Sequence, residues 1–246
     1  MILVFENEVD PESRYFVPEI ERQFAAAGVP VTVVPYAAAE EPPASFPAAV
    51  ERLSSDAEGA DGGADHDPSD VDGVVLSGST AGVYETGEYP WIRTAERLVR
   101  DLRDRRVPTL GVCFGHQLVN RALGGSVEHR GLHTGIESVA LGDDPLFAGV
   151  AERVPTIHGD FVTELGDGMT RIGTADYYDR LASRHETAPL WTVQYHPEFT
   201  ERLLPKIERD FGWPESAADR AFGAVSVEQT FENFAQLASE WDDTRE

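Results

Sequence analysis

The stretch VPTLGVCFGHQLVNRALGG, residues 107–125, contains the only cysteine of this 246-residue chain. The residues before Cys113 are apolar and predict the end of a buried strand, and those from His116 onward have the spacing of an amphipathic helix. Gly111 and Gly115 flank the cysteine, and because glycine has no Cβ, the backbone can turn tightly there and the helix can pack close to the strand. The pattern predicts a nucleophile elbow, the sharp strand-to-helix turn that exposes a reactive side chain.

The first half of the chain alternates between predicted strands and predicted helices. Apolar, β-branched segments predict strands at residues 1–7, 29–36 and 107–112, and a strand with its C-terminal loop at residues 71–79. Apolar residues at helical spacing predict helices at residues 13–27, 46–53, 89–106 and 116–123. Such alternation is typical of parallel strands joined by right-handed crossovers. Gly78 and Cys113 each follow a predicted strand, and the reactive groups of such sheets collect at the carboxyl ends of the strands.

The second half of the chain has shorter predicted strands and few helices. Segments separated by turn residues predict strands at residues 126–130, 136–141, 153–165, 169–178 and 189–199. We therefore expect an α/β fold with a mostly parallel central sheet and flanking helices, plus short antiparallel strands in the second half.

The chain is expected to form one main domain with two additions. The domain comprises residues 1–212 and carries an acidic, glycine-rich loop insertion at residues 54–70. Residues 213–246 extend the chain and include a last predicted helix. The apolar face of that helix consists of Phe231, Phe234 and Leu237. We expect this face to pack on the same domain.

The composition narrows the classes of partner. The formal net charge is −24, from 44 acidic and 20 basic residues, and Lys206 is the single lysine. Nucleic acids and anionic membranes would be repelled, so neither is expected as a partner. The acidity fits a protein adapted to high salt, where screening weakens self-repulsion. The acidic N-terminus does not resemble a signal peptide and no apolar stretch is long enough to span a membrane, so we expect a cytoplasmic protein.

A cysteine nucleophile needs a base that takes its proton and a group that orients this base. His196 directly follows the apolar segment LWTVQY, residues 190–195, near the end of the last predicted strand, and stands two residues before Glu198. Because residues two apart in an extended backbone point the same way, Glu198 is expected to reach the imidazole and to hold its tautomer. Apart from His158, the other histidines are interpreted as surface or hydrogen-bonded structural residues: His66, His116, His129, His133 and His185.

Three motifs now stand in order along the chain: LSGS at residues 76–79, GVCFGHQ at residues 111–117 and VQYHPEF at residues 193–199. Together they resemble the class I, triad-type glutamine amidotransferase family, which has a flavodoxin-like fold. The resemblance spans Met1 to about Leu204. It implies that Cys113 attacks the side-chain amide of glutamine and forms a γ-glutamyl thioester. His196, oriented by Glu198, would protonate the departing ammonia, and water would then release glutamate.

The same resemblance implies further roles around the cysteine. Backbone N–H groups of Gly78 and Phe114 would hold the oxyanion, and the helix predicted to begin near His116 would favour the thiolate. Gln117 and Ser79 would contact the substrate. Ser79 stands where the family often has a second glycine, which is a departure from its pattern. Neither a cofactor nor a metal is implied.

The stand-alone, GMP-synthetase-like branch of the family is the most similar one. His158 and Asp160 match an HGD element of that branch, where they would shape the mouth of the active site. The leading hypothesis is a hydrolase that delivers ammonia from glutamine to a separate synthetase. The alternatives are a γ-glutamyl hydrolase or peptidase that works without a partner, a cysteine hydrolase of the related protease and chaperone superfamily, and a non-catalytic binding module of the same fold.

Overall fold

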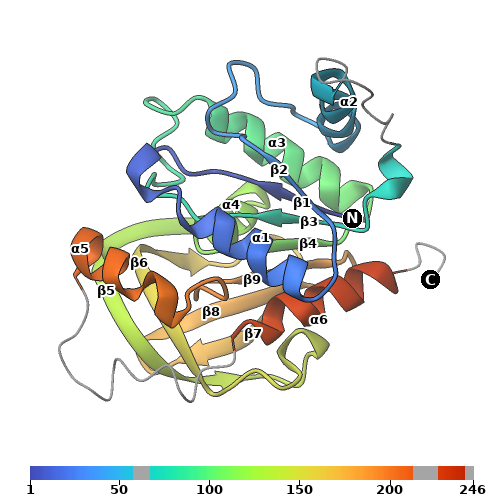
Figure 1. The fold of residues 1–246 in the computed structure, drawn as a ribbon. Coiled ribbons are helices and arrows are strands. Elements are labelled where there is room, and N and C mark those ends of the chain that lie inside the picture. The colour runs from blue at the N-terminus through green and yellow to red at the C-terminus, as the bar shows by residue number, and fades with distance from the viewer. Residues whose placement is uncertain (58–66, 213–226, 242–246) are drawn as a thin grey trace.

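The structure, a computed structural model, describes residues 1–57, 67–212 and 227–241 (Figure 1). The predicted loop at residues 54–70 is therefore described only in part. Its first residues are helical, because helix α2 continues to Ala57, and residues 58–66 lie outside the described residues. Most of the predicted C-terminal extension also lies outside them, and the last helix is its main described part.

A sheet runs through the described part of the chain with its strands in the order β2-β1-β3-β4-β9-β8-β7-β5-β6. The parallel strands are β2 (Val31–Val34), β1 (Ile2–Phe5), β3 (Gly73–Leu76), β4 (Thr109–Val112) and β9 (Leu190–Val193). The antiparallel strands are β8 (Tyr178–His185), β7 (Met169–Ala175), β5 (Ser126–Leu141) and β6 (Arg153–Glu164). The predicted fold class, a mostly parallel α/β sheet with antiparallel strands in the second half, is confirmed.

Helices cover both faces of the parallel strands, which explains why β1, β3, β4 and β9 are buried along their whole length. One face packs against α1 (Phe16–Ala26) and α6 (Gln229–Ser239). The other face packs against α2 (Phe46–Ala57), α3 (Trp91–Asp104) and α4 (Phe114–Ala122). A further helix, α5 (Leu204–Phe211), contributes to a smaller apolar cluster with β5 and β6. Short 3-10 helices occupy Pro11–Ser13, Pro68–Asp70, Pro145–Phe147 and Glu201–Leu203.

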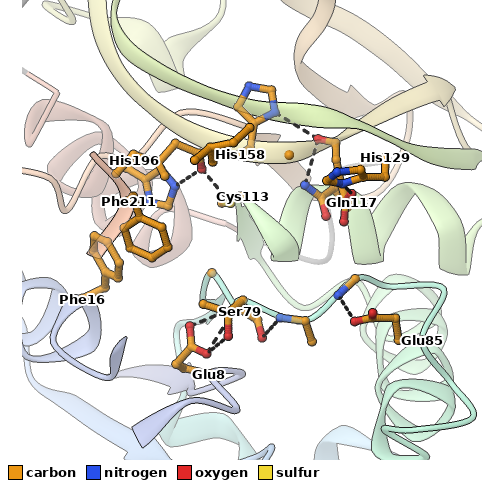
Figure 2. Close-up of a pocket in the computed structure, with 18 of the residues that line it drawn as sticks. Glu8, Phe16, Ser79, Glu85, Cys113, Gln117, His129, His158, His196 and Phe211 are labelled. Carbon is orange, nitrogen blue, oxygen red and sulfur yellow. Dashed lines mark hydrogen bonds and ion pairs between the residues drawn. The ribbon is translucent and has the colours of Figure 1, made fainter. Parts of the chain in front are cut away.

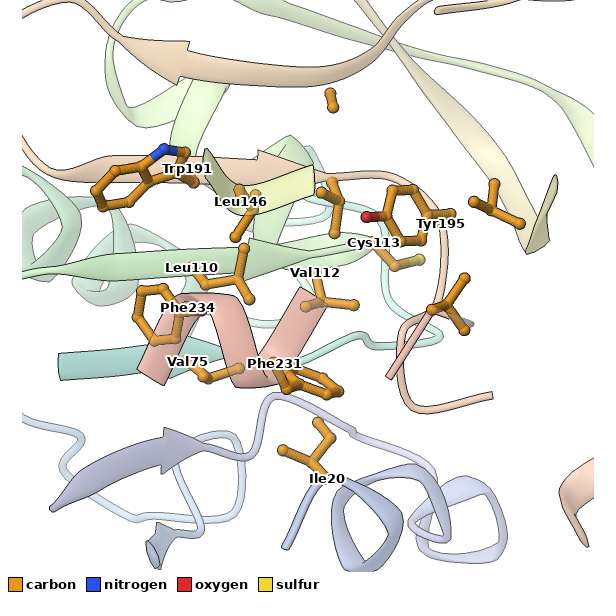
Figure 3. Packing of buried hydrophobic residues seen from close by; sticks show 14 of the residues in the cluster. Ile20, Val75, Leu110, Val112, Cys113, Leu146, Trp191, Tyr195, Phe231 and Phe234 are labelled. Carbon is orange, nitrogen blue, oxygen red and sulfur yellow. The ribbon is translucent and has the colours of Figure 1, made fainter. Parts of the chain in front are cut away.

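The last helix, α6, contributes directly to the main core (Figure 3). Phe231 and Phe234 are almost fully buried, and the ring of Phe231 lies 5.1 Å from that of Phe24 in α1. The ring of Phe234 meets Trp191 of β9 edge-on. On the same helix, Asn233 donates hydrogen bonds to the carbonyls that follow β5, at Leu146 and Ala148. These contacts link α6 to the parallel part of the sheet and to the segment between β5 and β6.

Several predicted boundaries are wrong. The predicted strands at 126–130 and 136–141 form one strand, β5, whose pairing with β6 shifts register between His129 and His133. Gly131 lies in this interruption with φ +95°, which breaks the alternation of the sequence. The segment predicted as one strand at 169–178 turns before Tyr178 and contributes to two strands, β7 and β8.

No helix among the described residues is both long and apolar enough to cross a membrane.

Candidate active site

Cys113 occupies a sharp turn between β4 and α4. Its φ is +50°, a left-handed conformation that side chains with a Cβ rarely adopt. The flanking glycines allow the close approach: a Cβ on Gly111 would lie 2.5 Å from the carbonyl oxygen of Gly115, and one on Gly115 would lie 2.3 Å from that of Leu76. The helix begins at Phe114, two residues earlier than predicted, so Cys113 is its N-cap residue. The thiol therefore lies at the positive end of α4.

His196 and Glu198 lie beside Cys113. The Nδ1–H of His196 donates a 2.7 Å hydrogen bond to Oε1 of Glu198, and both side chains are buried. The other ring nitrogen, Nε2, lies 3.0 Å from the carbonyl oxygen of Ile157, and the Sγ of Cys113 lies 3.7 Å from the same oxygen. Cys113, His196 and Glu198 lie close together, as predicted, but the reason given for the contact of His196 with Glu198, an extended backbone, is wrong. Strand β9 ends at Val193, and a turn closed by the N–H of Phe199 on the carbonyl of His196 brings the two side chains together.

The surroundings of His196 favour its charged form. Both ring nitrogens face an acceptor, and only the imidazolium has a proton on each. Burial alone would lower the pKa of His196, but the Glu198 carboxylate and Cys113 raise this pKa well above the usual value. Glu198 is completely buried, and its Oε2 has no hydrogen-bond partner among the described residues. The imidazolium is therefore the main compensation for a buried carboxylate.

Helix α1 contacts the turn that carries His196 and Glu198. The amide of Gln23 donates a 3.1 Å hydrogen bond to the carbonyl of Pro197, between His196 and Glu198. The ring of Phe16 stacks on the imidazole of His196, with centroids 5.3 Å apart and planes inclined by 30°. Both contacts limit the orientations that the imidazole can adopt.

The loop after β3 brings Gly78 to the same place. A Cβ on Gly78 would lie 3.6 Å from Cε1 of His196 and 3.7 Å from the Cβ of Cys113, so the backbone passes close to both. The backbone N–H groups of Gly78 and Phe114 have no acceptor among the described residues. Two unpaired N–H groups beside a cysteine are what a developing oxyanion needs.

The loop after β1 holds this segment in position. The backbone N–H of Asn7 donates to the hydroxyl of Ser77, and the Asn7 amide donates to the Ser77 carbonyl. The buried carboxylate of Glu8 accepts a 3.0 Å hydrogen bond from the N–H of Thr80 and another from its hydroxyl. Burial raises the pKa of Glu8, while these hydrogen bonds act in the opposite direction.

Gln117 and Asp160 lie on the other side of Cys113. The amide of Gln117 donates to the carbonyl oxygens of Asp160 and of the Gln194 side chain, both at 3.2 Å. The Asp160 carboxylate accepts hydrogen bonds from Nδ1 of His129 at 2.8 Å and from the hydroxyl of Tyr84 at 3.0 Å. Asp160 is thus held with its carboxylate toward the solvent-facing part of the site.

His158 is buried and structural in its contacts. Its Nδ1 donates to the Asp160 carbonyl, and its Nε2 accepts from the hydroxyl of Tyr177, both at 3.0 Å. Burial lowers the pKa of His158 to about 3, so the ring is neutral at physiological pH. His116, interpreted from the sequence as a surface or hydrogen-bonded structural residue, is fully buried between the hydroxyls of Thr192 and Tyr178.

A cavity of about 450 Å³ collects most of these residues (Figure 2). Its lining includes the predicted site residues Gly78, Ser79, Cys113, Gln117, His158, Asp160 and His196. Ser79 accepts the N–H of Ala81 through its hydroxyl. Glu198 and Phe114 do not line the cavity: Glu198 lies behind His196, and Phe114 contributes its backbone beside the thiol.

The sequence patterns miss other residues of this lining, among them Glu8, Phe16, Tyr84, Glu85, His129 and Phe211. His129, which the sequence suggests is a surface or structural histidine, reaches the cavity because β5 pairs with β6 so that His129 is directly opposite Asp160. Only the register of the two strands could have revealed that contact.

Comparison with known proteins decides the family. The sequence profile of the class-I glutamine amidotransferases matches residues 13–213. The chain belongs to the class I glutamine amidotransferase family. This membership confirms the resemblance carried by the three motifs, and the elbow, the histidine turn and the Gly78 loop all lie within the matched residues.

The individual relatives share about a third of their residues with this chain over the matched segments. One subunit of a glutamine-hydrolysing GMP synthase from Archaeoglobus fulgidus is 32% identical over 133 residues, covering 52% of this chain and 67% of that protein. Gamma-glutamyl peptidase 5 from Arabidopsis thaliana is 30% identical over 186 residues, covering 72% and 69%. A GMP synthase from Thermotoga maritima is 34% identical over 134 residues, and the match spans only 25% of its length.

Solved structures show the same fold. A glutamine amidotransferase from Thermotoga maritima superposes with a TM-score of 0.70 at 18% identity, covering 98% of this chain and 99% of that one. A glutamine amidotransferase from Methylobacillus flagellatus gives a TM-score of 0.69 at 14% identity, covering 100% and 97%. The arrangement of strands and helices is therefore that of the family.

Proposed function

We propose that this protein is a cysteine hydrolase that cleaves the side-chain amide of glutamine or of a γ-glutamyl compound. One observation carries the proposal: the Sγ of Cys113 and Nε2 of His196 face the same carbonyl oxygen, while Nδ1 of His196 bonds to the buried Glu198. A nucleophile, a proton donor and an orienting carboxylate thus stand together at the start of a helix.

The first half of the reaction uses the charged form of the pair. The imidazolium of His196 and the positive end of α4 favour the thiolate of Cys113. Its sulfur attacks the γ-carbonyl carbon, and the N–H groups of Gly78 and Phe114 stabilise the oxyanion that forms. The C–N bond breaks as His196 gives its proton to the leaving nitrogen, which departs as ammonia or an amine. A γ-glutamyl thioester remains on Cys113.

The second half regenerates the enzyme. The now neutral His196 accepts a proton from water, and the hydroxide attacks the thioester carbon. The C–S bond breaks, glutamate leaves, and the thiolate–imidazolium pair is restored. Glu198, bonded to Nδ1 of His196, fixes which ring nitrogen faces the substrate.

The glutamyl end of the substrate is proposed to lie on the Gln117 side of the cavity. Asp160 offers a carboxylate to the α-ammonium group, and Gln117 and Ser79 contribute polar contacts. His158, neutral and buried, holds the Asp160 backbone and so shapes the mouth. The similarity to one subunit of a GMP synthase supports an ammonia-accepting synthetase as partner, and the similarity to a γ-glutamyl peptidase supports hydrolysis without one.

The direct test is hydrolysis by the purified full chain. We expect glutamate to be released from glutamine, and Cys113→Ser to abolish this release. A diazoketone analogue of glutamine should alkylate Cys113, as peptide mass spectrometry would show. Glu51→Gln, on an exposed position of α2, is the matched control and should behave as the parent. Unchanged hydrolysis by Cys113→Ser would refute the proposal.

A further inference from the structure

The cavity is divided into two unlike halves by Cys113 (Figure 2). Phe16 and Phe211 lie on the side of His196, and Glu8 lies below them. Gln117 and His129 lie on the opposite side. The two phenylalanines come from α1 and from the last residue of α5, and neither belongs to the motifs that identify the family.

The proposed mechanism determines which half of the cavity holds the leaving group and which holds the glutamyl part. His196 protonates the leaving nitrogen, so the leaving group must lie on the His196 side of the scissile bond. The glutamyl part then extends toward Gln117 and Asp160. Whatever lines the His196 side is therefore in contact with the leaving group.

On the His196 side, two phenylalanine rings form an apolar wall that packs against the protein core. The Phe16 ring stacks on the imidazole of His196, and Phe16 and Phe211 both pack against the apolar cluster that contains Ile157, Phe199 and Ile207. Each phenylalanine is half-buried and keeps part of its surface toward the cavity. Ammonia has no apolar surface, so these rings contribute nothing to its binding. An alkyl or aryl group would be stabilised by leaving water for the same place.

The charged side chains on the His196 side decide which alkyl or aryl leaving groups fit there. Apart from the catalytic His196, whose imidazolium is paired with Glu198, the ionisable side chain here is Glu8, and its carboxylate is already engaged with Thr80. No arginine or lysine occurs among the described residues that line the cavity. A leaving group with its own carboxylate, as in a γ-glutamyl peptide, would therefore find no arginine or lysine to pair with and would lie near the carboxylate of Glu8.

We infer that the preferred substrate is a γ-glutamyl amide of an apolar amine without a carboxylate, with the amine bound against Phe16 and Phe211. This inference rests on the proposed hydrolase activity and names its substrate class. The cavity, at about 450 Å³, lies in the range of pockets that enclose ligands larger than an amino acid. The products would be glutamate and the free amine, formed with one water and no co-reactant.

The experiment compares kcat/KM of the full chain for four compounds: glutamine, γ-glutamylbenzylamide, γ-glutamylphenethylamide and γ-glutamylphenylalanine. The last two differ only in the carboxylate of the leaving group. We expect the benzylamide to exceed glutamine about 10-fold or more, which is the discrimination that an apolar pocket achieves for a larger apolar group. We expect the phenethylamide to exceed γ-glutamylphenylalanine by at least about 10-fold.

A variant separates binding from the intrinsic reactivity of the amides. Phe211→Ala should lower the ratio of benzylamide to glutamine hydrolysis about 10-fold, and Phe211→Leu should restore part of it. Phe211 is preferred over Phe16 because Phe16 also contacts the catalytic imidazole. Tyr89→Ala removes a half-buried aromatic ring outside the cavity and should leave the ratio unchanged.

The outcomes separate the preference for apolar amides from the hydrolase activity on which it rests. If none of the four compounds is cleaved, the proposed hydrolase activity itself fails. If glutamine is cleaved but the benzylamide is no better, or if Phe211→Ala leaves the ratio unchanged, the apolar subsite is refuted while the hydrolase remains. If γ-glutamylphenylalanine is cleaved as well as the phenethylamide, the exclusion of carboxylates is refuted.

Discussion

The carboxylate of Glu8 is bonded to both the backbone N–H and the hydroxyl of Thr80, 72 positions further along the chain. The bond joins the loop after β1 to the loop after β3, two residues beyond Gly78. The N–H that we assign to the oxyanion is therefore positioned by a buried acid that makes no part of the chemistry itself.

Glu8→Gln should lower kcat about 10-fold with a smaller change in KM. A glutamine amide has one acceptor oxygen, so it cannot accept all the N–H and O–H donors that the carboxylate binds. One lost hydrogen bond to a charged group is worth about 1.5–3 kcal/mol, of which part reaches the oxyanion. Steady-state kinetics on glutamine would measure the effect, with Thr80→Val, which removes only the hydroxyl, as a milder companion. Equal loss in binding and turnover would contradict a positioning role.

The same residue predicts a pH dependence. Burial raises the pKa of Glu8, so it takes up a proton at a higher pH than an exposed glutamate does. Protonation weakens its hold on Thr80, and kcat should fall on that acid limb. Because the folded state binds this proton more readily than the unfolded state, Glu8 does not itself promote acid unfolding. Activity should thus decline before circular dichroism reports unfolding, and the limb should move to lower pH in Glu8→Gln.

Glu198→Gln should lower kcat by about 10⁴, the loss seen when the aspartate of a serine triad becomes asparagine. Glu198 raises the pKa of His196, so its neutralisation should lower that pKa and move the alkaline limb of kcat/KM to lower pH. A histidine with a raised folded-state pKa stabilises the fold fully below its unfolded pKa, and this contribution disappears as pH rises through the folded pKa. The variant should lose that pH-dependent stability, which urea unfolding at two pH values would reveal.

Gly115→Ala should destabilise the protein by about 3 kcal/mol or more, at the upper end of overpacking effects. The added Cβ would lie 2.3 Å from the backbone carbonyl of Leu76, which cannot rotate away. Gly87→Ala is the control, because a Cβ there meets nothing within 4 Å. Denaturant unfolding of both variants measures the difference. Near-equal midpoints would mean that α4 does not need its close contact with β3.

How much the sequence could predict depends on how local each feature is. The elbow was predictable because Gly111, Cys113 and Gly115 are neighbours in the chain and their spacing alone imposes the turn. Its helix begins two residues earlier than predicted because Phe114 continues the backbone turn directly from the cysteine. The contact of His196 with Glu198 was predicted from strand alternation, yet a turn produces it.

The walls of the cavity were not predictable in this way. Glu8, His129 and Phe211 reach it from three distant segments, and each contact depends on how strands and helices are placed in space. His129 depends on a strand register that shifts at Gly131. Phe211 depends on where α5 packs, and its flanking sequence carries no motif.

Phe234→Ala should destabilise the whole protein by about 3–5 kcal/mol, the usual cost of removing a buried phenylalanine ring. We expect this because Phe234 is fully buried between α6 and the sheet, edge-on to Trp191. Gln236→Ala, on the exposed side of the same helix, should change stability little. A single unfolding transition, shifted only in the first variant, would support one domain that includes α6. An unshifted main transition would instead make the helix a dispensable addition.

The net charge of −24 predicts that salt stabilises the fold. With 44 acidic and 20 basic residues, like charges repel one another across the compact protein more than in the unfolded chain. Raising KCl from about 0.1 M to about 1 M shortens the screening length from about 10 Å to about 3 Å and weakens this repulsion. Each kcal/mol added to the free energy of unfolding should raise Tm by about 2–4 °C in a protein of this size. Sucrose strengthens burial without screening charge, so the rise in KCl should exceed the rise at equal osmolality of sucrose. A Tm that is flat or falling in KCl would contradict adaptation to high salt.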